Sequence, residues 1–61
     1  MSPVEMFNIT VTEKGSYIIS YLADGWTREL VLTVSNPQEA MMKTQNLIGS
    51  INRVTFVERW C

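Results

Sequence analysis

The dipeptide Asp24-Gly25 limits what this chain can fold into more than any other feature of its sequence. It separates two segments rich in β-branched and aromatic residues, 17–22 and 26–34. Both central residues of a type I′ turn need positive φ, and Asp-Gly is one of the few dipeptides that readily supply it. The dipeptide therefore predicts a β-hairpin with a two-residue loop, and it fixes which residues of the two strands face each other.

In the predicted register Ala23 faces Trp26, and each following pair lies one residue farther from the turn on both strands. Side chains alternate between the two sides of such a ribbon. One side, which we call face A, carries Tyr17, Ile19, Tyr21, Ala23, Trp26, Arg28, Leu30, Leu32 and Val34. The other side, face B, carries Ile18, Ser20, Leu22, Thr27, Glu29 and Val31. Face A is the more apolar, so we assign it to the core.

The segment before the hairpin predicts a further strand, because Phe7, Ile9 and Val11 alternate with polar residues. A two-residue loop at Lys14-Gly15 would turn this apolar set to face B. A three-residue loop, 14–16, with Gly15 at positive φ, returns the set to face A. We therefore expect the longer loop.

A helix is predicted from the capping pattern that begins at Asn36. Asn36 can cap the helix, Pro37 suits its first position, and Glu39 completes a capping box. We expect the helix to end near Leu47 or Ile48, with Gly49 as the stop. Its buried stripe is predicted to comprise Ala40, Met41, Thr44, Leu47, Ile48 and Ile51.

Residues 53–60 predict a last strand with Val54 and Phe56 inward, running parallel to the first and third strands. A right-handed crossover could place it beside the first strand. The predicted fold is a single α+β domain over residues 1–61, in the order β-β-β-α-β. It is a small, mostly antiparallel sheet with one helix packed on face A.

Composition argues against catalysis and against cofactors. The chain has 61 residues, no histidine and one cysteine, and its six acidic and five basic residues leave a net charge of −1. Without histidine no Ser-His or Cys-His pair can form, and a zinc site lacks its usual ligands. The three glycines lie far apart and form no phosphate-binding loop. We therefore expect no enzymatic activity and no metal or other cofactor.

The chain also carries no sign of a membrane or secretory segment. Its longest apolar run, 30–32, is far shorter than the roughly 20 residues of a membrane span. Residues 1–6 lack the order of a signal peptide. We expect a cytoplasmic protein (in the host cytoplasm if viral) with no membrane contact and with Cys61 reduced.

Apolar residues on face B indicate a surface for a protein partner, because a solvated face of a small sheet is normally more polar. Arg53 and Arg59 are predicted to share this face with Val57. Trp60 is predicted either to anchor against the core or to face a partner. The candidate partner-binding residues are Ile18, Leu22, Arg28, Glu29, Val31, Arg53, Val57 and Arg59.

Two alternatives remain beside a protein-binding module. One is a single-strand nucleic-acid binder that uses Tyr21, Trp26, Arg28 and Arg59. The balance of charge and the isoelectric point near 5.1 make this class the less expected one. The other is a structural homodimer, since a chain this short buries only about 60% of the surface its unfolded form exposes.

The sequence resembles the small phage-encoded inhibitors of host enzymes, in particular the T7-type inhibitors of bacterial RNA polymerase. The resemblance lies in the aromatic-led segment 7–11, the hairpin, the capped helix that begins with 36–40, and the closing segment 54–59. This chain is less acidic than those inhibitors and has an extra strand at Asp24-Gly25. The resemblance implies a compact protein without cofactors that acts by occupying the surface of a partner, and it assigns no role to a particular residue.

Overall fold

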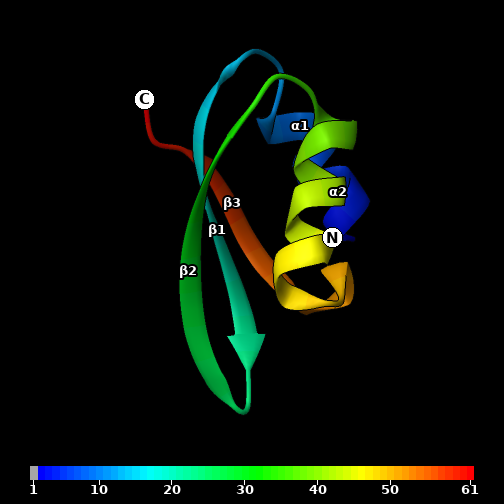
Figure 1. Cartoon of the computed structure of the whole chain (residues 1–61), viewed down its shortest axis with the longest axis vertical. Coiled ribbons are helices and arrows are strands. Elements are labelled where there is room, and N and C mark those ends of the chain that lie inside the picture. The colour runs from blue at the N-terminus through cyan, green and yellow to red at the C-terminus, as the bar shows by residue number, and fades with distance from the viewer. Residues whose placement is uncertain (1) are drawn as a thin grey trace.

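The computed structural model describes residues 2–61 (Figure 1). The elements follow one another as α1 (Pro3–Thr10), β1 (Gly15–Ala23), β2 (Trp26–Val34), α2 (Pro37–Ile48), the 3-10 helix η1 (Ile51–Arg53) and β3 (Val54–Arg59). The strands form one antiparallel sheet in the order β2-β1-β3, and both helices lie on the same side of it. The chain therefore has a small α+β fold, as predicted, but with the order α-β-β-α-β.

The hairpin has the predicted turn and the predicted register. Asp24 and Gly25 have φ of 53° and 80°, so both occupy the left-handed region that a type I′ turn requires. Ala23 pairs with Trp26, and the ladder runs without a break to the pair of Gly15 and Val34. The two-residue loop at Asp24-Gly25 is therefore confirmed.

The assignment of face A to the core is also confirmed. Tyr17 and Ile19 are fully buried, and Leu32 and Val34 are nearly so. They pack with residues from both helices and from β3, namely Phe7, Val11, Ala40, Val54 and Val57. One hydrophobic core thus fills the space between face A and the helices.

The strand predicted at 7–12 is wrong, because this segment forms the end of α1 and the turn after it. Phe7 and Val11 are both fully buried, whereas Ile9 between them is 63% exposed. A spacing of four residues fits one face of a helix as well as it fits alternation in a strand. The exposure of Ile9 is the observation that distinguishes the helix from the predicted strand, in which Ile9 would be buried with Phe7 and Val11.

The first turn of α1 explains why a helix forms despite several β-branched residues. Ser2 caps it, since the Ser2 hydroxyl accepts a hydrogen bond from the Glu5 amide at 3.3 Å, and Pro3 occupies the first turn. This is the arrangement predicted for Asn36-Pro37-Gln38-Glu39, and the sequence carries it a second time in residues 2–5. The predicted loop at 14–16 is consequently wrong too, and Gly15 begins β1 without positive φ.

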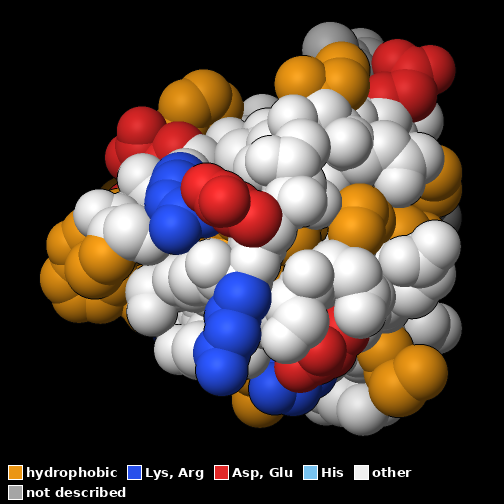
Figure 2. Space-filling view, turned by 90° about the horizontal axis from the view of Figure 1, so that it is seen from above, with side chains coloured by type: hydrophobic (Ala, Val, Ile, Leu, Met, Phe, Trp, Pro, Cys, Tyr) orange, Lys and Arg blue, Asp and Glu red, His pale blue; other side chains and the backbone are white. Residues whose placement is uncertain are grey.

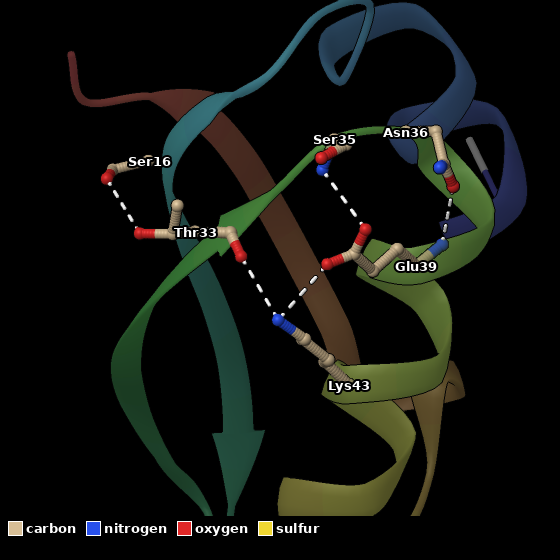
Figure 3. A network of polar contacts seen from close by, with 6 residues as sticks. All are labelled: Ser16, Thr33, Ser35, Asn36, Glu39 and Lys43. Carbon is tan, nitrogen blue, oxygen red and sulfur yellow. Dashed lines mark hydrogen bonds and ion pairs between the residues drawn. The ribbon is translucent and has the colours of Figure 1, made fainter.

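Helix α2 has the predicted bounds and caps, and Figure 3 shows the cap at its first turn. The Asn36 side chain accepts a hydrogen bond from the Glu39 amide at 2.8 Å, and the Glu39 carboxylate accepts one from the Ser35 amide at 3.4 Å. Gly49 ends the helix with φ of 76°. Ala40 and Thr44 are buried, but Leu47, predicted for the buried stripe, is exposed.

Strand β3 runs antiparallel to β1 and therefore in the same direction as β2. The expected direction relative to the strand at 26–34 is thus correct. The neighbour of β3 differs from the expected one: β3 pairs with β1, whereas the prediction placed it beside the segment at 7–12. Helix α1 packs against β3 and α2, and α2 packs against β2, so face A alone is covered.

Replacing Ile9 tests the assignment of α1. We expect Ile9→Ala to change the free energy of unfolding by less than about 0.5 kcal/mol, because the side chain is exposed and Ala favours a helix. Phe7→Ala should cost about 3–5 kcal/mol, because it empties a buried site. Urea unfolding of both variants measures the difference, and comparable losses would contradict the helix.

Replacing Thr44 tests the packing of α2. The Thr44 hydroxyl is buried and has no hydrogen-bond partner among the described residues. Thr44→Val keeps the shape and removes the hydroxyl, so it should raise the free energy of unfolding by about 1 kcal/mol. Thr44→Ser, which keeps the hydroxyl and loses the methyl group, serves as the control and should lower it. A loss of stability in Thr44→Val would show that the hydroxyl is satisfied.

Candidate protein-binding face

Face B of the sheet carries no helix, because α1 and α2 both lie over face A (Figure 1). The two strand registers and the alternation of side chains define the residues of this face. They are Ser16, Ile18, Ser20 and Leu22 on β1, Thr27, Glu29, Val31 and Thr33 on β2, and Phe56 and Glu58 on β3. Face B is therefore a three-stranded surface open to a partner.

The apolar residues of face B form one patch. Ile18 is paired directly with Val31, and Phe56 is paired with Ser20. Phe56 therefore lies diagonally to both Ile18 and Leu22, a separation that an aromatic side chain can bridge. Leu22 and Val31 are each 46% exposed and Phe56 is 53% exposed. The predicted residues Ile18, Leu22 and Val31 are thus brought together on an uncovered face, which Phe56 extends onto β3.

Val57 is not part of this face, contrary to the prediction. The pairing of β1 with β3 shifts at Ser20 and Tyr21, so that Thr55 is an extra residue between the partners of these two. Such a bulge reverses the faces on one side of it. Val54 and Val57 both point into the core, and Phe56, predicted to be inward, points outward. The predicted orientation of the adjacent apolar pair Phe56-Val57 is therefore wrong, because simple alternation from Val54 takes no account of the bulge at Thr55.

Arg53 and Arg59 do not share face B either. Arg53 ends the 3-10 helix η1, outside the sheet. Arg59 pairs with Tyr17 and therefore lies on the side of face A. The predicted arginine stripe on face B does not exist in the structure.

Arg59 instead connects β3 to the turn between α1 and β1. Its guanidinium forms an ion pair with the Glu13 carboxylate at 3.0 Å and donates hydrogen bonds to the Tyr17 hydroxyl at 3.2 Å and the Lys14 carbonyl at 3.3 Å. The Tyr17 hydroxyl donates in turn to the Glu13 carbonyl at 2.7 Å. A Cβ on Gly15 would lie 2.9 Å from the Arg59 guanidinium. We assign Arg59 a structural role on this basis.

The remaining aromatic residues lie at two ends of the molecule. Trp26 is 72% exposed beside the hairpin turn, where the half-buried Tyr21 is paired with the exposed Arg28. Arg59 lies opposite Tyr17, about 20 Å farther along the strand at the usual rise per residue. The four residues named for nucleic-acid binding therefore do not form one platform. Trp60 is exposed, while its amide donates to the Ser16 carbonyl at 2.8 Å, so its side chain does not anchor in the core.

The charges of face B are all negative. Glu29 and Glu58 are its only ionisable side chains, since the basic residues lie elsewhere: Lys14 in the turn before β1, Lys43 on α2, Arg53 in η1, and Arg28 and Arg59 on the side of face A. The end of the molecule that Figure 2 shows is different, because acidic and basic side chains adjoin one another there. Face B thus combines an apolar patch with two carboxylates and no cation.

Other kinds of site have little support in residues 2–61. This part of the chain encloses no pocket, and no three of its acidic or cysteine side chains gather as a metal site would require. Neither helix has the length and apolar character needed to cross a bilayer. No family model matches the sequence, and the curated proteins and solved structures compared with it gave no match.

Replacing the adjacent residues Phe56 and Val57 tests the bulge. Phe56→Ser should lower the free energy of unfolding by less than about 1 kcal/mol, because its side chain is largely in solvent. Val57→Ser should lower it by about 2–4 kcal/mol, because it removes buried apolar atoms and buries a hydroxyl. Denaturant unfolding of both variants provides the measurement. The opposite order of the two losses would place Phe56 in the core and Val57 on face B.

Proposed function

We propose that this protein is a non-catalytic protein-binding module that docks on a partner protein through face B. The observation that supports the proposal is the uncovered apolar patch of Ile18, Leu22, Val31 and Phe56. A contiguous exposed apolar patch rimmed by polar residues is typical of an interaction surface. The sheet beneath it is fixed by an unbroken hairpin ladder, so the patch is presented on a rigid element.

The charges of face B favour a partner of a particular chemistry. Glu29 and Glu58 flank the apolar patch, and no Lys or Arg of residues 2–61 lies on the same face. Complementary potentials across an interface speed association and select the right partner. The partner surface should accordingly present apolar side chains surrounded by Lys or Arg.

The same charges count against two other occupants of face B. A nucleic acid would bring phosphates toward the two carboxylates, which have no basic residue beside them to compensate. A second copy docked face to face would bring both carboxylates of each copy into one interface without a cation. Neither arrangement is expected to be stable, because uncompensated charges are costly to bury.

The mechanism that fits a small, rigid binding face is steric. A partner enzyme whose surface is covered by face B would lose access to substrate or the freedom to move. The narrower form of the proposal, an inhibitor of a host enzyme, draws on the resemblance to phage-encoded inhibitors. One element of that resemblance, the segment 7–11, belongs to α1 and the residue after it, so the proposal rests first on face B.

Affinity capture from the native host tests the proposed function. The tagged wild-type protein should retain a specific protein, identified by mass spectrometry, and the double variant Leu22→Ser/Val31→Ser should lose it. Met42→Ser is the control, because Met42 is an exposed apolar residue on α2, away from face B. We expect this control to retain the partner.

Two results would contradict the proposal. One is the capture of the same protein by the face B variant but not by Met42→Ser, which would place the binding surface on the helices. The other is recovery of nucleic acid alone. If the protein also binds single-stranded oligonucleotides with an affinity that falls steeply as salt is added, this would support a nucleic-acid-binding function.

A further inference from the structure

The outer edge of β2 is an unpaired strand edge. β2 has nine residues and lies at one margin of the sheet, with β1 on its inner side and no strand on its outer side among residues 2–61. An edge of this kind presents a row of free amide and carbonyl groups to another strand.

The hydrogen bonds of the sheet show which peptide groups point outward. The carbonyls of Ser16 and Ser20 on β1 accept bonds from the Trp60 amide and the Thr55 hydroxyl, so the even-numbered residues of β1 face β3. The odd-numbered residues of β1 consequently face β2, where they pair with its even-numbered residues. The peptide groups that point away from the sheet on β2 are therefore those of Thr27, Glu29, Val31 and Thr33.

One side chain from outside the strand covers this edge, and it does so only at one end. The Lys43 ammonium reaches from α2 to the Thr33 carbonyl at 3.2 Å, held there by an ion pair with Glu39 at 3.1 Å (Figure 3). The rest of β2 contains no proline, and its register with β1 has no bulge. β3, the other edge strand, has six residues and carries the bulge. Natural proteins blunt edges with such bulges, prolines and charges. β2 has the charges of Arg28 and Glu29 but no bulge or proline, so it is the more open of the two edges.

We propose that β2 pairs with β2 of a second copy of this chain, antiparallel and centred on Leu30. In this register the strand is paired along its full length, since Trp26 lies opposite Val34 of the second copy. Glu29 lies opposite Val31, and Thr27 lies opposite Thr33, so the outward peptide groups exchange hydrogen bonds in pairs.

The sequence of β2 favours this register over its neighbours. Each charged residue lies opposite an aliphatic one, because Arg28 faces Leu32 and Glu29 faces Val31. If the pairing were centred on Glu29, the Glu29 carboxylates of the two copies would lie directly opposite each other. If it were centred on Arg28, the two Arg28 guanidinium groups would do so. Like charges in directly opposite positions destabilise a sheet. A shift the other way, to Val31, leaves the ends of both strands unpaired.

The paired sheet has a consequence for face B. The two sheets join into one of six strands, and the face B patches of both copies lie on the same side of it. This inference does not depend on the proposed function, because it concerns the edge of β2 and leaves face B free.

Amide hydrogen exchange measured by NMR at several protein concentrations tests the inference directly. The amides of Leu30 and Leu32, which bond to β1, should be protected at every concentration. The amides of Glu29 and Val31 should exchange rapidly in dilute protein and become protected as concentration rises, in step with a dimer mass in sedimentation. A monomer at the highest concentration, a dimer in which these two amides stay unprotected, or protection independent of concentration would each overturn the inference.

Two matched variants test the same edge by sedimentation. Val31→Pro removes the outward amide without touching the ladder to β1, whereas Val31→Ser loses the same side chain and keeps the amide. We expect Val31→Pro to weaken the dimer at least about tenfold relative to Val31→Ser, because peptide hydrogen bonds at the seam are lost. Retained far-ultraviolet circular dichroism confirms folding of each variant.

Lys43→Ala provides a change in the opposite direction. It removes the side chain that competes for the Thr33 carbonyl, so it should strengthen the dimer. Equal dimer affinity of Val31→Pro and Val31→Ser, or a weaker dimer in Lys43→Ala, would contradict pairing through β2.

Discussion

The turn at Asp24-Gly25 is the constraint on which the rest of the structure depends. Its two positive φ angles allow a loop of only two residues, and that loop sets every pair of the ladder from Ala23–Trp26 to Gly15–Val34. Because side chains alternate along a strand, a slip of one residue would exchange the two faces. The turn thus places Tyr17 and Ile19 in the core and puts the half-buried Ile18 and the exposed Val31 on the opposite face.

The helices formed by residues 2–61 cover only one side of the sheet. Phe7 and Val11 of the α1 region and Ala40 of α2 complete the core over face A, and no helix formed by residues 2–61 covers face B. Burial of apolar side chains on face A stabilises the fold. Face B keeps a contiguous group of apolar residues, which is unusual for a surface that contacts only solvent. The proposed binding face is thus a direct result of where the helices pack.

The parts of the fold that sequence could predict are those governed by local signals. The Asp24-Gly25 turn and the Asn36 cap of α2 each depend on a few adjacent residues, and both are found as predicted. Helix α1 does not follow from the sequence pattern, because Phe7, Ile9 and Val11 suit a strand by alternation and by propensity, and packing against β3 and α2 overrides both. The signal for this helix in the sequence is the cap at Ser2, which repeats the pattern at Asn36.

The sequence predicts which residues of the hairpin lie on face B, but it does not predict which residues of β3 lie there. Ile18, Leu22, Val31 and Glu29 follow from the register of the turn alone. The place of Phe56 depends on a bulge opposite Ser20 and Tyr21, which arises from pairing between segments far apart in the chain.

Solvent relaxation of methyl groups tests the central claim most directly. With a soluble paramagnetic gadolinium complex added to a methyl-labelled sample, the account predicts strong line broadening for the methyl groups of Leu22 and Val31. It predicts weak broadening for those of Ile19 and Val34. Strong broadening of Ile19 and Val34 together with protection of Leu22 and Val31 would show that the helices cover the other face, and it would contradict the account.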